Sequence, residues 1–131
     1  MKKLFVMSML AVTTFASAAF AAPNNLVVVN DISSTSTAYV RGTAAGAPIA
    51  AHSLAAFPWA TVTAICNNTA SMNATNVCAL EIYAETNTAT PVDVGTVVIY
   101  VDTGHLVALN RHNVPYQLHA DDSGRITLSD N

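Results

Sequence analysis

Residues 78–84 have the sequence Cys-Ala-Leu-Glu-Ile-Tyr-Ala, in which apolar and polar side chains alternate. Successive side chains of a β-strand point to opposite faces of a sheet, so Leu80 and Ile82 share the face opposite to Glu81. This alternation is typical of a strand with one face in a hydrophobic core and the other in water. The stretch therefore predicts an antiparallel sheet whose outer face carries Glu81 and Tyr83.

Similar strand signals recur along the rest of the chain. Alternating or β-branched segments bounded by turn residues lie at 26–29, 38–41, 61–66, 92–101, 106–109, 114–119 and 125–128. The Asp- and Gly-containing segments 102–104 and 121–124 predict tight turns of hairpins. Residues 49–60 give no clear prediction, because Pro58 would end any helix there. About eight strands at this spacing predict an all-β fold, namely a single antiparallel β-sandwich (Greek-key or immunoglobulin-like) or a small barrel.

Two cysteines, Cys66 and Cys78, flank a polar loop. In the sequence, one ends the alternating segment 61–66 and the other begins the alternating segment 78–84, so we expect each to lie at a strand end. An even pair in an exported protein indicates a disulfide, and the absence of Cys-x-x-Cys spacing argues against a redox or metal site. The sequence therefore predicts one structural disulfide between Cys66 and Cys78.

The first 21 residues have the layout of a secretory signal peptide of bacterial type. Lys2 and Lys3 precede an apolar run, and Ala19-Phe20-Ala21 matches the small-x-small pattern of a cleavage site. Polar residues interrupt the apolar run before it reaches the length that a membrane span needs. We therefore expect a cleaved signal peptide over residues 1–21 and one all-β domain over residues 22–131, in the periplasm or secreted.

Residues 22–131 contain no lysine, three arginines and eight carboxylates, which gives a formal net charge of −5. A surface of this charge has no electrostatic attraction for nucleic acid or anionic lipid. No further stretch is long and apolar enough to span a membrane after signal cleavage. The expected partner is therefore neither a nucleic acid nor a bilayer, and the composition leaves the oligomeric state undetermined.

Three histidines recur at intervals of seven, at His105, His112 and His119. Imidazole binds zinc or copper, but a site needs three or four ligands in matched geometry. The three side chains would meet at one site only if the turns between them brought their strands side by side. A zinc- or copper-binding protein therefore stays an alternative, while the main prediction is that the protein has no cofactor.

The residues that would carry catalysis lack their usual partners. Glu81 and Glu85 share a strand face, but acid–base hydrolysis requires two carboxyl groups that another group holds around a substrate. His52 precedes Ser53 in the sequence, yet a base must reach its nucleophile in space. We therefore expect no enzyme activity, and a small carbohydrate-binding or hydrolytic domain is the remaining alternative.

Aromatic residues offer a binding surface instead. Phe57-Pro58-Trp59 contains the only tryptophan, and Tyr83 lies on the predicted outer face. Exposed aromatic rings anchor protein partners, whereas a buried Trp59 would be part of the core. The sequence thus predicts an exported, non-enzymatic interaction module that binds a protein partner, with Phe57, Trp59 and Tyr83 as candidate contacts within or near the segment 44–60.

Overall fold

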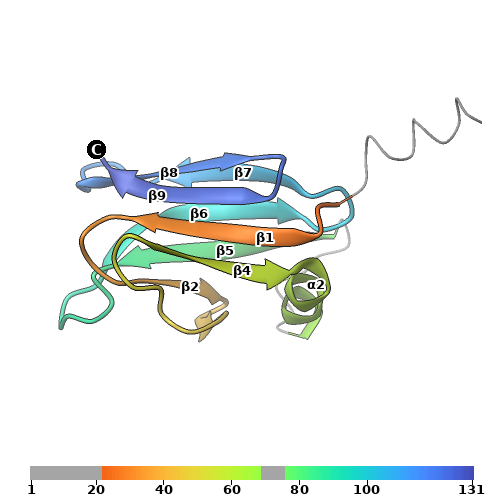
Figure 1. The fold of residues 1–131 in the computed structure, drawn as a ribbon, viewed down its shortest axis with the longest axis horizontal. Coiled ribbons are helices and arrows are strands. Elements are labelled where there is room, and N and C mark those ends of the chain that lie inside the picture. The colour runs from red at the N-terminus through yellow and green to blue at the C-terminus, as the bar shows by residue number, and fades with distance from the viewer. Residues whose placement is uncertain (1–21, 69–75) are drawn as a thin grey trace, which may run out of the picture.

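The computed structural model describes residues 22–68 and 76–131, which form two β-sheets packed face to face (Figure 1). The expected signal peptide, residues 1–21, lies outside the described residues. Within the described ranges, no helix is long and apolar enough to cross a membrane.

One sheet has four strands in the order β4-β1-β9-β8. Their bounds are Ser53–Pro58 for β4, Asn25–Asp31 for β1, Arg125–Asp130 for β9 and Tyr116–Asp121 for β8. The expectation of a wholly antiparallel arrangement is wrong at one place, because β1 pairs with β9 in parallel. Parallel neighbours need a long connection between them, and here nearly the whole chain lies between the two strands.

The other sheet has five strands in the order β3-β2-β5-β6-β7, all antiparallel. Their bounds are Thr43–Ala44 for β3, Ser36–Val40 for β2, Val77–Ala84 for β5, Val92–Tyr100 for β6 and His105–Asn110 for β7. The predicted hairpin turns join β6 to β7 and β8 to β9. The prediction of an all-β sandwich is therefore confirmed.

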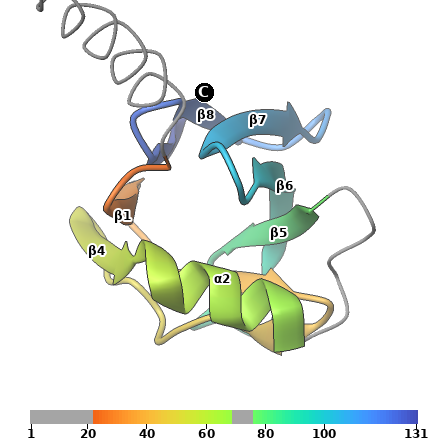
Figure 2. The same ribbon diagram turned by 90° about the vertical axis from the view of Figure 1, so that its right-hand side faces the viewer.

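The segment 61–66 is not a strand, as the alternation predicted, but part of helix α2, Trp59–Asn68. Val62, Ile65 and Cys66 turn inward at the spacing of a helical face, so this short apolar pattern fits either period. Pro58 precedes the helix instead of ending it, and a proline at this boundary is compatible with a helix start. Helix α2 lies across one end of the sandwich, beside β4 (Figure 2).

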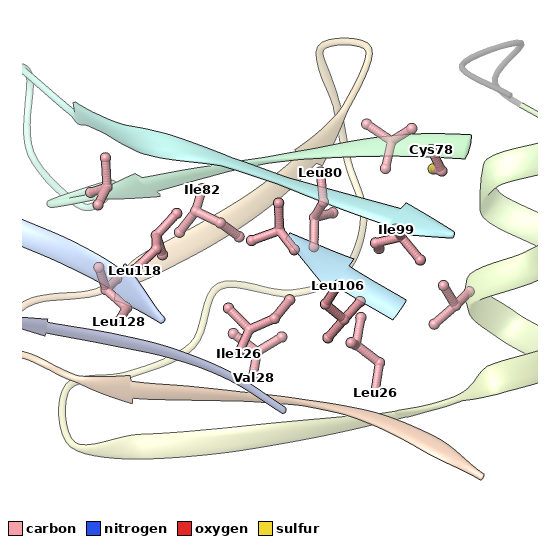
Figure 3. Packing of buried hydrophobic residues seen from close by; sticks show 14 of the residues in the cluster. Leu26, Val28, Cys78, Leu80, Ile82, Ile99, Leu106, Leu118, Ile126 and Leu128 are labelled. Carbon is pink, nitrogen blue, oxygen red and sulfur yellow. The ribbon is translucent and has the colours of Figure 1, made fainter. Parts of the chain in front are cut away.

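The core lies between the two sheets (Figure 3). Val28 and Ile126 from the four-stranded sheet point toward Leu80 and Ile99 from the five-stranded sheet, and all four are buried. In β5 the buried residues alternate with more exposed ones, as the sequence predicts. The alternation of residues 78–84 therefore places one side of this strand in the core.

The predicted disulfide joins Cys66 of α2 to Cys78 of β5. The Cα atoms are 5.8 Å apart, and both side chains are buried. The bond therefore attaches the helix to the five-stranded sheet, rather than joining two strands as expected.

Along one side, hydrogen bonds of the Asn110 side chain join the two sheets, in the way that the backbone of a neighbouring strand would. The Nδ2 group of Asn110 in β7 donates to the carbonyl oxygen of Leu118 in β8 at 3.0 Å, and the Leu118 N–H donates to Asn110 Oδ1 at 2.6 Å. Near the other end of β7, the Leu106 N–H donates to Asp122 Oδ1. These bonds close the β7–β8 side of the sandwich.

Reduction of the disulfide is expected to lower the free energy of unfolding by about 3 kcal/mol, because the cross-link restricts the unfolded chain. Urea unfolding followed by circular dichroism, with and without reductant, measures this loss. A Cys66→Ser/Cys78→Ser variant should not respond to reductant. An equal urea midpoint for the oxidised and reduced wild-type protein would contradict the prediction.

Asn110→Ala is expected to lower the free energy of unfolding by about 1–2 kcal/mol, since it leaves both backbone groups of Leu118 without their partner. Gln117→Ala is the matched control, because Gln117 is an exposed residue of the same strand β8. Chemical unfolding of the two variants should separate them clearly. Equal stability would show that the Asn110 amide does not hold β7 to β8.

Candidate functional site

The three aromatic residues expected to bind a partner do not form one surface. Phe57 belongs to β4 at the edge of the four-stranded sheet, and Trp59 begins helix α2. Tyr83 belongs to β5 in the interior of the five-stranded sheet. The candidate contacts therefore divide into an edge region and a separate region on the outer face of the other sheet.

The edge region is built on β4, which pairs only with β1 within the described part of the chain. Trp59 N–H donates to the carbonyl oxygen of Asn24, and the alternation of an antiparallel pair then directs the backbone groups of Phe57 toward β1. The backbone N–H and C=O groups of Leu54 and Ala56 consequently point away from the sheet. Among the described residues, no strand pairs with these outward groups, so they form the open edge of β4.

The side chains of β4 are uncharged from Ser53 to Pro58. Leu54 is 59% exposed, and Ala56 is exposed on the same face. Natural edge strands are commonly protected by lysine, proline or a bulge. Here Pro58 stands only at the end of the strand, so its central part is an unprotected, apolar edge.

Phe57 points to the opposite, inner side of β4. Its ring packs against Gly46, where an added Cβ would lie 2.8 Å from the ring. It also lines a small apolar cavity of about 30 Å³ between the sheets, together with Val28, Val62 and Leu80. Phe57 is therefore mainly a packing residue that closes the β4 side of the core.

Trp59 is half-buried rather than fully buried or fully exposed. Its indole N–H donates to the carbonyl oxygen of Val101 at 3.0 Å. Since Val101 directly follows β6, this bond attaches the start of α2 to the five-stranded sheet. This hydrogen bond gives Trp59 a structural role.

On the outer face of the five-stranded sheet, Tyr83 lies beside Tyr39 of β2. The ring centroids are 5.4 Å apart and the ring planes are nearly perpendicular, at 85°. With Glu81, Gly42 and Pro91 they line a surface hollow of about 270 Å³. This hollow was not foreseen, since residues from separate strands form it.

A β-bulge shapes the surroundings of this hollow. The register shifts between Ile82 and Tyr83, so Tyr83 pairs with Asp93 across the strands. The extra residue is Val94 of β6; next to it, Gly95 has a φ of 155°, and a Cβ there would lie 2.3 Å from the Leu109 carbonyl oxygen. Only glycine fits at this point, and the bulge brings Asp93 alongside Tyr83.

The three histidines considered as metal ligands lie on different parts of the chain: His105 on β7, His112 on the β7–β8 connection and His119 on β8. His105 Nδ1 lies 2.8 Å from Asp122 Oδ1, whereas His112 and His119 are exposed on the β7–β8 connection and on β8. Over residues 22–68 and 76–131, no group of three or more His, Cys, Asp or Glu side chains could hold a metal ion. The structure thus offers no arrangement in the described chain to which zinc or copper ligands could be assigned.

Three of the four residues weighed for catalysis, Glu85, His52 and Ser53, are engaged in other contacts. The Tyr116 hydroxyl donates to Glu85 Oε2 at 2.5 Å, and this hydrogen bond and burial raise the pKa of Tyr116. His52 Nδ1 lies 3.4 Å from Asp31 Oδ1, while the Ser53 hydroxyl donates to the Ala51 carbonyl oxygen. The hydroxyl of Ser53 is therefore not directed to His52.

Sequence reasoning did not single out Leu54 within the expected segment 44–60, and it did not place Tyr39 beside Tyr83. Leu54 and Ala56 alternate with inward-facing residues of β4, but the position of β4 at the edge of its sheet follows only from the strand pairing. No local signal could have found Tyr39, because its ring meets Tyr83 only after β2 pairs with β5.

Comparison with known proteins matches the chain to one protein family. A family model described as "T2SS substrate NttC" matches residues 1–131. The chain is also similar to the crystal structure of the Legionella pneumophila type II secretion system substrate NttC, at 27% identity and a TM-score of 0.71 over 84% of this chain and 100% of that one. No curated protein matches the chain. With the whole chain covered by that model, the protein belongs to the NttC family of type II secretion system substrates.

Proposed function

We propose that this exported protein is a non-enzymatic interaction module that binds an extended segment of a protein partner along strand β4. The partner segment adds to the four-stranded sheet as a fifth strand, with its backbone bonded to Leu54 and Ala56. Addition of a strand to a free sheet edge is a common mode of peptide recognition. We further propose that the protein passes through the periplasm and acts outside the cell.

The observation that carries this proposal is the uncharged outer edge of β4. The outward backbone groups of Leu54 and Ala56 supply hydrogen bonds, and the 59% exposed side chain of Leu54 supplies apolar contact. An edge without charged side chains is open to pairing with another strand. The membership in a family of secreted substrates supports a partner outside the cytoplasm.

The outer edge can be blocked without disturbing the pairing with β1. Ala56→Pro removes an N–H group that points away from β1, so we expect the fold to persist while strand addition is lost. Photo-leucine in place of Leu54 should form a cross-link with a different protein in the medium into which the chain is secreted, and Ala56→Pro should abolish it.

The matched control places photo-leucine at Leu109, which is 54% exposed on the outer face of the other sheet. Equal cross-linking at Leu54 and Leu109, or cross-linking that Ala56→Pro leaves unchanged, would contradict binding along β4. An adduct of two copies of this chain would contradict a foreign partner.

Trp59 is expected to contribute to stability more than to partner capture. Trp59→Ala should lower the free energy of unfolding by about 3 kcal/mol through lost packing, and Trp59→Phe by about 1 kcal/mol through the lost bond to Val101. Thermal and urea unfolding measure both. A Trp59→Ala variant with unchanged stability but lost cross-linking at Leu54 would instead identify Trp59 as a partner contact.

A further inference from the structure

A second candidate site lies on the outer face of the five-stranded sheet, away from β4. Tyr39, Glu81 and Tyr83 line the hollow of about 270 Å³, and we call these three residues the tyrosine hollow. Tyr39 stands opposite Glu81 in the β2–β5 pairing, and Tyr83 follows Glu81 on the same face of β5. The sheet therefore holds the two rings and the carboxylate in one place.

The two rings form perpendicular walls. Their interplanar angle of 85° sets the edge of one ring against the face of the other, which is a favourable aromatic geometry. Both tyrosines keep part of their surface in water, because neither is buried. The corner that they form is therefore preorganised and accessible.

The carboxylate of Glu81 is available to a ligand. It has no hydrogen bond or ion pair among the contacts of the described residues. The nearby cation, Arg111, is already engaged, since its Nη2 lies 2.9 Å from Asp93 Oδ2 and its Nε donates to the same oxygen. Among the described residues, the Glu81 carboxylate of the hollow therefore has no directly paired cation, and Arg41, which precedes the lining residue Gly42, is the other positive residue near it in the sequence.

The electrostatic surroundings of Tyr83 agree with this description. Burial raises the pKa of the Tyr83 hydroxyl, and the charges of Asp93 and Glu81 raise it further, against a smaller opposite effect of Arg111. Negative potential at the hollow favours a positive ligand. The absence of lysine from residues 22–131 also leaves the protein surface with few positive groups of its own.

We propose that the tyrosine hollow binds the trimethylammonium group of a choline compound. The ring faces attract the cation through their quadrupoles, and Glu81 supplies the counter-charge. An ammonium ligand in the hollow would therefore be attracted both by the faces of the two tyrosine rings and by the Glu81 carboxylate. This site does not depend on whether β4 binds a partner.

The proposal is tested by titrating the folded protein with choline chloride at constant ionic strength and following its backbone amides by NMR. We expect saturable shifts confined to β2 and β5, with a dissociation constant of about 1 mM. The neutral isostere 3,3-dimethyl-1-butanol, which has the same shape without the charge, should bind at least about tenfold more weakly.

Glu81→Gln and Tyr39→Leu should each weaken choline binding about tenfold while the amide spectrum stays that of a folded protein. Asp130→Asn removes the same charge at an exposed position, and Tyr100→Leu removes another aromatic ring of the same sheet; both should bind choline as the wild type does. Ala56→Pro should also bind choline normally, which separates this site from the β4 edge.

Vesicle co-sedimentation distinguishes the two sources of the cation. Co-sedimentation with phosphatidylcholine vesicles that free choline inhibits assigns the trimethylammonium group to a lipid headgroup, and choline binding without co-sedimentation assigns it to a soluble choline compound. The proposal is overturned if choline does not bind, or if N-acetyl-lysine methylamide binds as tightly as choline. It is equally overturned if the neutral isostere or methyl glucoside binds as tightly as choline, since the charge of Glu81 would then play no part.

Discussion

The packing of two alternating apolar faces against each other is the interaction on which the rest of this structure depends. Each strand places every second side chain in the space between the sheets, so Leu80, Ile99 and Ile126 are buried while their neighbours reach water. A shift of one residue in the register of β5 would exchange its two faces and place Glu81 and Tyr83 in the core. The same constraint that forms the core therefore also displays the residues of the tyrosine hollow.

The two sides of the sandwich differ in a way that bears on function. Along β7 and β8, the Asn110 side chain supplies the hydrogen bonds that a neighbouring strand would otherwise supply. Along β4, the outward backbone groups have no strand partner within residues 22–68 and 76–131, and β4 itself carries no charged side chain. An edge of this kind is open to pairing with another strand, including unwanted pairing with other chains.

The helix and the disulfide complete the end of the sandwich beside this edge. Cys66 attaches α2 to β5, and the Trp59 indole attaches the start of α2 to the backbone after β6. Because α2 directly follows β4, these two attachments also fix where the edge strand ends. The end of β4 is thus anchored to the five-stranded sheet through α2.

By itself, the sequence determined the all-β class, the core faces of the strands, the Cys66–Cys78 bond and the two Asp/Gly hairpin turns, because these follow from local periodicity, turn chemistry and cysteine count. It was wrong for residues 61–66, where a six-residue apolar pattern fits a helix as well as a strand, and burial of Val62 and Cys66 against the sheets decided for the helix. Only the tertiary structure decided that β1 pairs in parallel with β9, that β4 is an edge strand, and that Tyr39 meets Tyr83 beside Glu81. These features depend on which distant strands become neighbours, and no local pattern of side chains encodes that choice.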